Sequence, residues 1–307
     1  MRRLYELDAI RGVAALVVFT HHWLTLNGYS AGLGVAPSIA VDLFFVLSGF
    51  VMTRTYEGQI RDGSISTLRF IALRYRRLFF PMAFGSTIGF IQTIAANGVP
   101  GAETFASYLL ILAFIPTFWK ADPFSFNLPA WSLLLEIAAN AVHGTVLRRL
   151  SKKALVGSFA ACAALAGALL SAGYGRWGFG VLPILSCFPR ELAFYLAGII
   201  AFRTRGDAGF RMRPSGISAA LGALSYPLYA VHMPAMLFFR ALGLSPLLGP
   251  VFSLALAAMI AVSASNRAAS RSERVSGARK GPSDRLLQIL PVEIFKGLRR
   301  RLLLHGR

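Results

Sequence analysis

A small set of ionisable residues lies inside segments that are otherwise apolar, and these residues are the first candidates for chemistry. Placing Asp, Lys or Arg at the middle of a lipid bilayer costs at least about 2.5–3.5 kcal/mol, so such residues usually have a function. Arg190 and Glu191 are adjacent, and we expect them to compensate each other. The full set is Arg11, His21, His22, Asp42, Glu136, His143, Arg190, Glu191 and His232.

Arg11 and His22 have a spacing that suits a shared site. Eleven residues are close to three turns of an α-helix, so both side chains lie on one face, about 16 Å apart along the axis. Asp8 lies on the same face and could pair with Arg11. The alternative is structural: an arginine that reaches the membrane surface and a histidine hydrogen-bonded within a helix bundle.

Helical rise predicts how deep the other candidates lie. Counted from the expected outer surface, His22 lies about 8 Å deep, Asp42 about 9 Å, Glu136 about 12 Å and His232 about 14 Å. We therefore expect these four groups to cluster in the outer half of the membrane, where a histidine beside carboxylates suits general-base catalysis. Arginines that suit phosphate binding gather at the inner face, namely Arg11, Arg74, Arg76 and Arg77.

The composition indicates what must position these residues. Of the 307 residues 55% are hydrophobic and only 15% are charged, and the mean hydropathy is +0.59. A soluble domain averages about 25% charged residues. Disorder, collagen, a disulfide scaffold and a soluble nucleic-acid-binding domain all fit poorly. The two cysteines, Cys162 and Cys187, show no metal-ligand spacing, and no metal site is expected. The sequence predicts an all-α, polytopic membrane bundle.

Segments of about 20 apolar residues mark the expected spans. A shorter segment, 105–118, is expected to enter the membrane without crossing it. With that assignment every arginine-rich loop falls on one side, so both termini are predicted to be cytoplasmic. The eight expected spans are 8–27, 36–53, 79–98, 128–147, 154–173, 180–203, 216–241 and 247–265.

Net charge has a topological explanation. The chain carries +19, mostly in loops and in the tail 266–307, and this pattern favours membrane orientation over a nucleic-acid partner. We therefore divide the chain into a membrane domain, 1–265, and a basic cytoplasmic tail, 266–307. The tail is either an amphipathic segment on the anionic inner leaflet or a disordered basic extension.

Four motifs occur in a fixed order along the chain: LDAIRG at 7–12, VDLFFVLSGF at 41–50, WSLLLE at 131–136 and LSYPLYAVH at 224–232. Together they resemble the acyltransferase-3 family of bacterial membrane acyltransferases. The chain departs from the family pattern in three places. Ile137 stands where a second acidic residue is common, the segment 204–223 is short where members often have further spans, and Arg77 lies four residues before Pro81 instead of three.

The resemblance implies transfer of an acyl group, often acetyl, from a coenzyme A thioester to a carbohydrate hydroxyl at the cytoplasmic membrane. It implies essential roles for Arg11 and His22. Asp42, Glu136 and His232 lie in signature motifs with less defined roles. The acyl-CoA is a substrate, and no permanently bound cofactor is expected.

These residues combine into one expected mechanism. The CoA phosphates would bind among Arg11, Arg74, Arg76 and Arg77, and His22 would deprotonate the acceptor hydroxyl. Asp42 or Glu136 would orient His22, as the third member of a catalytic triad does. Ser48, Ser132 and Ser225 are either acyl carriers or helix-packing residues. A proton-coupled transporter of a sugar or lipid-linked sugar would use similar buried groups and is the alternative.

Overall fold

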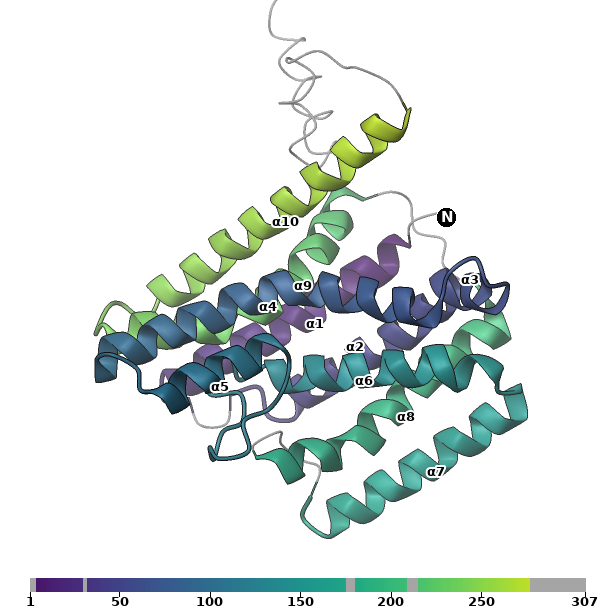
Figure 1. Cartoon of the computed structure of the whole chain (residues 1–307), viewed down its shortest axis with the longest axis horizontal. Coiled ribbons are helices and arrows are strands. Elements are labelled where there is room, and N and C mark those ends of the chain that lie inside the picture. The colour runs from purple at the N-terminus through teal and green to yellow at the C-terminus, as the bar shows by residue number, and fades with distance from the viewer. Residues whose placement is uncertain (1–3, 30–31, 175–179, 209–214, 277–307) are drawn as a thin grey trace, which may run out of the picture.

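The computed structural model describes residues 4–29, 32–174, 180–208 and 215–276. In this part of the chain all regular structure is helical (Figure 1). The predicted amphipathic segment of the tail lies outside the described residues. The α-helices are α1 (Tyr5–Leu26), α2 (Ala36–Met52), α3 (Gly58–Arg61), α4 (Thr67–Asn97), α5 (Ala102–Leu112), α6 (Ala130–Thr145), α7 (Lys152–Ser171), α8 (Val181–Arg205), α9 (Gly216–Ala241) and α10 (Leu248–Ser276).

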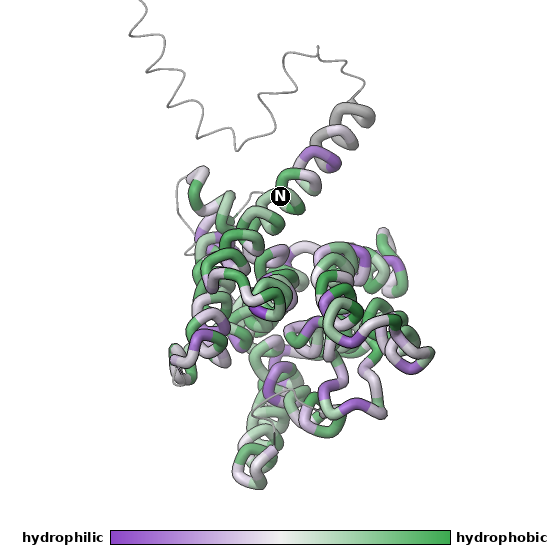
Figure 2. Tube along the Cα trace, turned by 90° about the vertical axis from the view of Figure 1, so that its left-hand side faces the viewer, coloured by the Kyte–Doolittle hydropathy of each residue, from purple (hydrophilic) through white to green (hydrophobic). Residues whose placement is uncertain are grey.

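Length and composition confirm a polytopic membrane bundle. Seven of the described helices are long and apolar enough to cross a membrane. The eighth predicted span is α9, which has the length at 26 residues but is less apolar and packs between α1, α4 and α10. Large apolar side chains also face outward, among them Val13, Phe84 and Leu182 at 53–63% exposure. Figure 2 shows hydrophobic residues along most of the helices, as lipid contact requires.

Helix α5 has only 11 residues, about 16 Å of rise, and cannot cross a bilayer. The prediction that 105–118 does not span the membrane is therefore confirmed. The last part of the loop after α5 is packed against the bundle, with Phe124, Phe126 and Asn127 buried. Asn127 in this loop donates hydrogen bonds to the carbonyls of Met82 (3.3 Å) and Ala230 (3.0 Å), on α4 and α9. As a result α6 begins inside the bundle.

The helix that contains the third predicted span, 79–98, starts well before that span. Helix α4 begins at Thr67, where the Ser66 hydroxyl accepts a hydrogen bond from the backbone N–H of Arg69. A capped start this early allows the helix to continue for 31 residues, longer than the membrane requires. Arg74 and Arg77 therefore lie within α4, and their spacing of three residues places both side chains on one face of that helix.

Glycines allow α2 and α8 to cross in backbone contact. A Cβ at Gly49 would overlap the carbonyl oxygen of Tyr195, and one at Gly198 would overlap that of Val46. Small residues at such crossings are typical of membrane helix pairs. This contact fixes α8 against α2, and these two helices carry Glu191 and Asp42.

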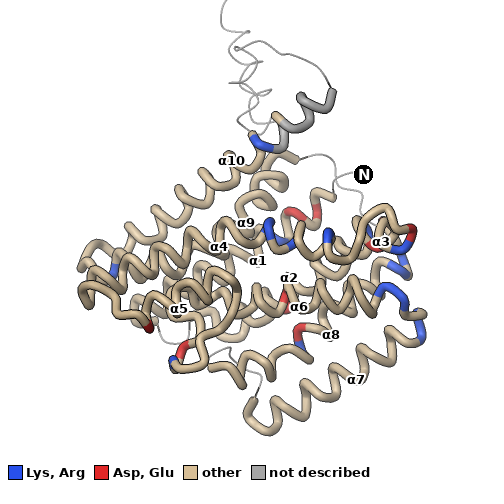
Figure 3. The backbone as a smooth tube through the Cα atoms, viewed as in Figure 1, with Lys and Arg blue, Asp and Glu red and all other residues tan. Residues whose placement is uncertain are grey.

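Positive charge lies mainly at one end of the described bundle. Figure 3 shows Lys and Arg gathered around α3 and where α6 meets α7, with few at the opposite end. The positive-inside rule assigns the charged end to the cytoplasm. We call it the inner end and the opposite one the outer end.

Helix α7 offers a direct test of this orientation, because its two ends lie on opposite sides. Lys153 and Ala172 are both exposed. With Cys162 and Cys187 replaced by alanine, Ala172→Cys should react with an impermeant maleimide on intact cells. Lys153→Cys should react only after permeabilisation. Labelling of Lys153→Cys from outside would contradict the orientation.

Candidate active site

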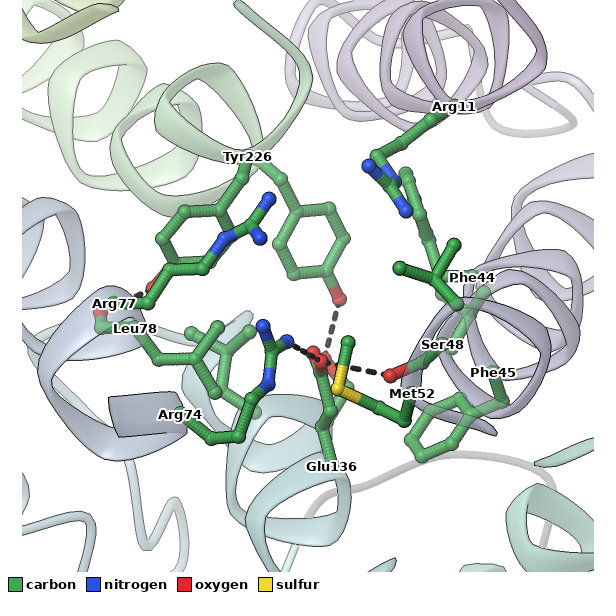
Figure 4. Close-up of a pocket in the computed structure, with 15 residues that line it drawn as sticks. Arg11, Phe44, Phe45, Ser48, Met52, Arg74, Arg77, Leu78, Glu136 and Tyr226 are labelled. Atoms are coloured by element: carbon green, nitrogen blue, oxygen red, sulfur yellow. Dashed lines mark hydrogen bonds and ion pairs between the residues drawn. The ribbon is translucent and has the colours of Figure 1, made fainter. Parts of the chain in front are cut away.

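Helices α1, α2, α4, α6 and α9 enclose a cavity towards the inner end, which we call the inner cavity. Three arginines converge on it, Arg11 from α1 and Arg74 and Arg77 from α4 (Figure 4). Its lining residues are Arg11, Val41, Phe44, Phe45, Ser48, Val51, Met52, Arg74, Arg77, Leu78, Ser132, Leu133, Glu136, Tyr226 and Tyr229.

The inner cavity has an excess of positive charge. Glu136 is the single carboxylate among its described lining residues, and its Oε1 accepts from the Arg74 guanidinium at 2.9 Å and from the Ser48 hydroxyl at 3.1 Å. The Arg74 Nε is buried with no hydrogen-bond partner among the described residues. Three guanidinium groups thus face one carboxylate in a space of about 70 Å³, which suits a small anionic group such as a phosphate.

A second cavity of about 270 Å³ lies on the other side of Val41 and Tyr229, and we call it the outer cavity. On α1 this cavity is lined by His22, which lies eleven residues after Arg11. Val41 and Tyr229 line both cavities, and the Tyr229 hydroxyl is 2.6 Å from the Ser132 hydroxyl. The outer lining is Val18, His21, His22, Thr25, Pro37, Ser38, Val41, Leu128, Pro129, Trp131, Arg190, Glu191, Tyr229 and Met233.

His22 is held by a second histidine. Its Nδ1 lies 2.8 Å from Nε2 of His232, which is fully buried on α9. The Nδ1 of His232 lies 3.0 Å from the Leu228 carbonyl and 2.9 Å from the Tyr229 carbonyl. Carbonyl oxygens only accept, so His232 carries its proton on Nδ1 and its neutral Nε2 accepts from His22.

This hydrogen-bond chain determines the tautomer of His22. Because Nδ1 of His22 donates to His232, the proton of a neutral His22 is on Nδ1 and its Nε2 has a free lone pair. A lone pair on a histidine that lines a cavity is what a general base requires. The orienting partner is thus His232, and not Asp42 or Glu136 as the sequence suggested.

The four groups predicted to cluster in the outer half are divided between two places. His22 and His232 come together, and Asp42 forms an ion pair with Arg190, which lines the same cavity as His22, with 2.6 Å between Oδ2 and the guanidinium. Glu136 lies with the arginines of the inner cavity. The depth count assumed that α6 starts at the outer surface, whereas Asn127, just before α6, is buried against Met82 of α4 and Ala230 of α9.

Two further expectations are corrected by the geometry. Arg190 forms its ion pair with Asp42, so it acts on Glu191 only by charge at a distance and not through a direct contact. Arg76 is exposed and does not line the inner cavity, although Arg74 and Arg77 do. Residues three apart share a helix face, whereas neighbours differ by about 100°.

A buried polar network near the inner end was missed by sequence reasoning. Glu57 accepts from His143 Nε2 (3.1 Å) and pairs with Arg203 (2.9 Å), while His143 Nδ1 contacts the Tyr195 hydroxyl (2.9 Å). Glu57 is the last residue of a π-helical turn, Thr53–Glu57, which no pattern in the sequence predicted. The network joins this turn to α6 and α8 outside both cavities, so it stabilises the bundle.

These features define a polytopic membrane protein with a cationic inner cavity back to back with a histidine-containing outer cavity. A family model described as an acyltransferase domain matches residues 4–208, two thirds of the chain. The chain belongs to this acyltransferase-3 family, and the predicted resemblance is confirmed. It is therefore a membrane acyltransferase by family.

The chain is also similar to a protein named "Protein 2 in picA locus" from Rhizobium radiobacter. The two are 31% identical over 163 residues, which cover 46% of this chain and 81% of that protein. No solved structure matches the chain. The family match ends before α9, yet α9 supplies Tyr226, Tyr229 and His232, so residues outside the match complete both cavities.

Proposed function

We propose that the protein is a cytoplasmic-membrane O-acyltransferase. It transfers an acyl group, most simply acetyl, from acyl-CoA to a hydroxyl of a cell-surface or lipid-linked carbohydrate. The observation that carries this proposal is the pair of cavities that share Val41 and Tyr229 as a wall. One cavity suits an anionic donor and the other a neutral hydroxyl acceptor beside a base.

The proposed binding site for the acyl donor rests on the positive charge of the inner cavity. Phosphate groups of CoA would bind Arg11, Arg74 and Arg77, because a guanidinium matches two phosphate oxygens at once. The cavity volume of about 70 Å³ admits only part of such a molecule, so the nucleotide would remain towards the inner end. The acyl thioester would then point to the shared wall and towards His22.

The proposed reaction at the acceptor hydroxyl rests on the contact between His22 and His232. His22 Nε2 takes the proton of the acceptor hydroxyl, and the oxygen attacks the thioester carbonyl. A new C–O bond forms and the C–S bond breaks, and the proton held by His22 passes to the departing sulfur to give free CoA. His232 accepts a hydrogen bond from His22 Nδ1 throughout, which keeps the proton on Nδ1 and leaves Nε2 as the reactive nitrogen.

The proposed function is tested most simply in the organism that carries the chain. Surface and lipid-linked carbohydrates from a strain lacking the gene should lose an acyl-sized mass increment in mass spectrometry, and the wild-type gene should restore it. The His22→Ala gene, expressed at the same level, should not. Unchanged carbohydrate masses in the deletion strain would contradict the proposal.

Arginine-to-lysine substitutions test the donor site. Lysine keeps the charge but cannot form the two-point contact with phosphate. Arg11→Lys and Arg77→Lys should each raise the acyl-CoA KM by about tenfold or more, the value of about one charged hydrogen bond. Steady-state kinetics with acetyl-CoA provide the measurement.

Arg76 supplies the matched control. It lies on the same helix next to Arg77 and is likewise exposed, but unlike Arg77 it does not line the inner cavity. Arg76→Lys should leave the acyl-CoA KM within about twofold of wild type. Equal KM values for all three variants would mean that the arginines only orient the protein in the membrane.

A further inference from the structure

Glu191 on α8 differs from the other buried acidic residues of the described chain. It is 0% exposed, yet neither carboxylate oxygen has a hydrogen-bond partner among the described residues. Glu57 has His143 and Arg203, and Asp42 has Arg190. An unsatisfied buried acceptor costs about 1–3 kcal/mol, and more when it is charged. A group left in this state requires an explanation.

The neighbouring residues do not explain why Glu191 is buried without a hydrogen-bond partner in the described structure. The Arg190 side chain is directed to Asp42 at 2.6 Å, although Arg190 is adjacent to Glu191 in the chain. The second oxygen of Asp42, Oδ1, is likewise buried without a partner in the described part of the protein. Asp42 and Arg190 both act on Glu191 electrostatically, with opposite signs, but neither donates a hydrogen bond to it. This side of the bundle therefore has three acceptor oxygens that lack donors.

Glu191 lines the outer cavity together with His22 and Trp131. At about 270 Å³ this cavity is just below the range of about 300–1,000 Å³ that is usual for small-molecule sites. Trp131 is half-buried and provides an aromatic surface, while Thr25 and Ser38 add hydroxyls. A ligand that fits must have several hydrogen-bond donors and also an apolar face. A sugar ring has both.

We propose that Glu191 binds the acceptor, with its carboxylate accepting hydrogen bonds from hydroxyl groups next to the one that reacts. This inference rests on the proposed function and adds an acceptor-binding residue to it. The contact holds the sugar so that the reacting hydroxyl lies at Nε2 of His22. It also selects polyhydroxylated acceptors over simple alcohols, because a single hydroxyl cannot occupy both His22 and Glu191.

Glu191→Gln is the informative variant. Glutamine keeps the volume but has one accepting oxygen in place of two and no charge. The matched control is Glu103→Gln, the same change at an exposed position in the first turn of α5, away from both cavities. The acceptor probe is the unmodified carbohydrate extracted from the deletion strain, offered at graded concentrations with radiolabelled acetyl-CoA to purified protein in nanodiscs.

The wild type and Glu103→Gln should transfer label with the same kcat and the same KM values for acceptor and acetyl-CoA. Glu191→Gln should raise the apparent acceptor KM by about three- to tenfold, the effect of losing one hydrogen bond, with the acetyl-CoA KM unchanged. Simple alcohols such as 1-butanol should react equally poorly with wild type and Glu191→Gln, because they lack the second hydroxyl.

Each other outcome has a definite meaning. An acceptor KM equal to that of wild type, or a fall in kcat alone, overturns the role assigned to Glu191. An equal rise in both KM values shows a general structural defect and overturns it too. If the wild type transfers no label to the extract, the proposed function itself fails, and the inference fails with it.

Discussion

Replacement of His22 by alanine should lower transfer by about 10²–10⁴-fold, the usual contribution of a general base. The variant should still insert and bind acyl-CoA, because His22 lies in the outer cavity and Arg11, Arg74 and Arg77 line the inner one. The measurement is kcat with acetyl-CoA and the extracted carbohydrate, alongside the CoA affinity from calorimetry.

His21 is the natural control for this prediction. It lines the same cavity, but its Nδ1 accepts a hydrogen bond from the backbone N–H of Leu33 at 3.2 Å, and among the described residues it has no histidine partner of the kind that His22 has in His232. His21→Ala should cost less than about tenfold, well below the effect of a general base. Equal losses for the two variants would show that neither histidine is a specific base.

Substitutions at His232 should separate orientation from packing. His232→Leu leaves the Nδ1 proton of His22 without an acceptor, so kcat should fall by about 10- to 100-fold. Losses of that size follow removal of the partners that orient metal-bound histidines. His232→Gln places an amide oxygen near the position of Nε2, which can accept from His22, and should retain most of the activity.

The comparison between leucine and glutamine is decisive because both fill a fully buried position on α9. Thermal unfolding in nanodiscs should show whether either variant is destabilised. Equal loss of kcat in both variants, with equal stability, would mean that the His22–His232 contact has no role in setting the tautomer.

Several parts of the architecture could be predicted from sequence because local periodicity determines them. Apolar segments predicted the spans, and helical spacing correctly placed Arg11 and His22 on one face of α1, where they now line different cavities. Motif order correctly indicated the family. The short length of α5 followed from its composition as well.

Contacts between distant segments could not be predicted in the same way. Glu136 was misplaced because the loop before α6 packs into the bundle through Asn127, which no periodicity reveals. The contact between His22 and His232 joins residues 210 positions apart. Arg190 forms its ion pair with Asp42 on another helix, so Glu191 has no hydrogen-bond partner in the described part of the chain, which adjacency in the sequence did not indicate.

Buried histidines and carboxylates would also suit a proton-coupled transporter of sugars. The family assignment and the arginines of the inner cavity favour an acyltransferase. The two functions differ in one chemical event. An acyltransferase breaks a thioester bond for each acceptor it modifies, whereas a transporter leaves thioesters intact.

Thioester consumption is therefore the most direct test of the account. Purified protein in nanodiscs should release free CoA from acetyl-CoA when unmodified carbohydrate from the deletion strain is present, with one acetylated acceptor for each CoA. The His22→Ala variant should release almost none. Wild-type protein that binds the carbohydrate but releases no CoA above the His22→Ala background would contradict it.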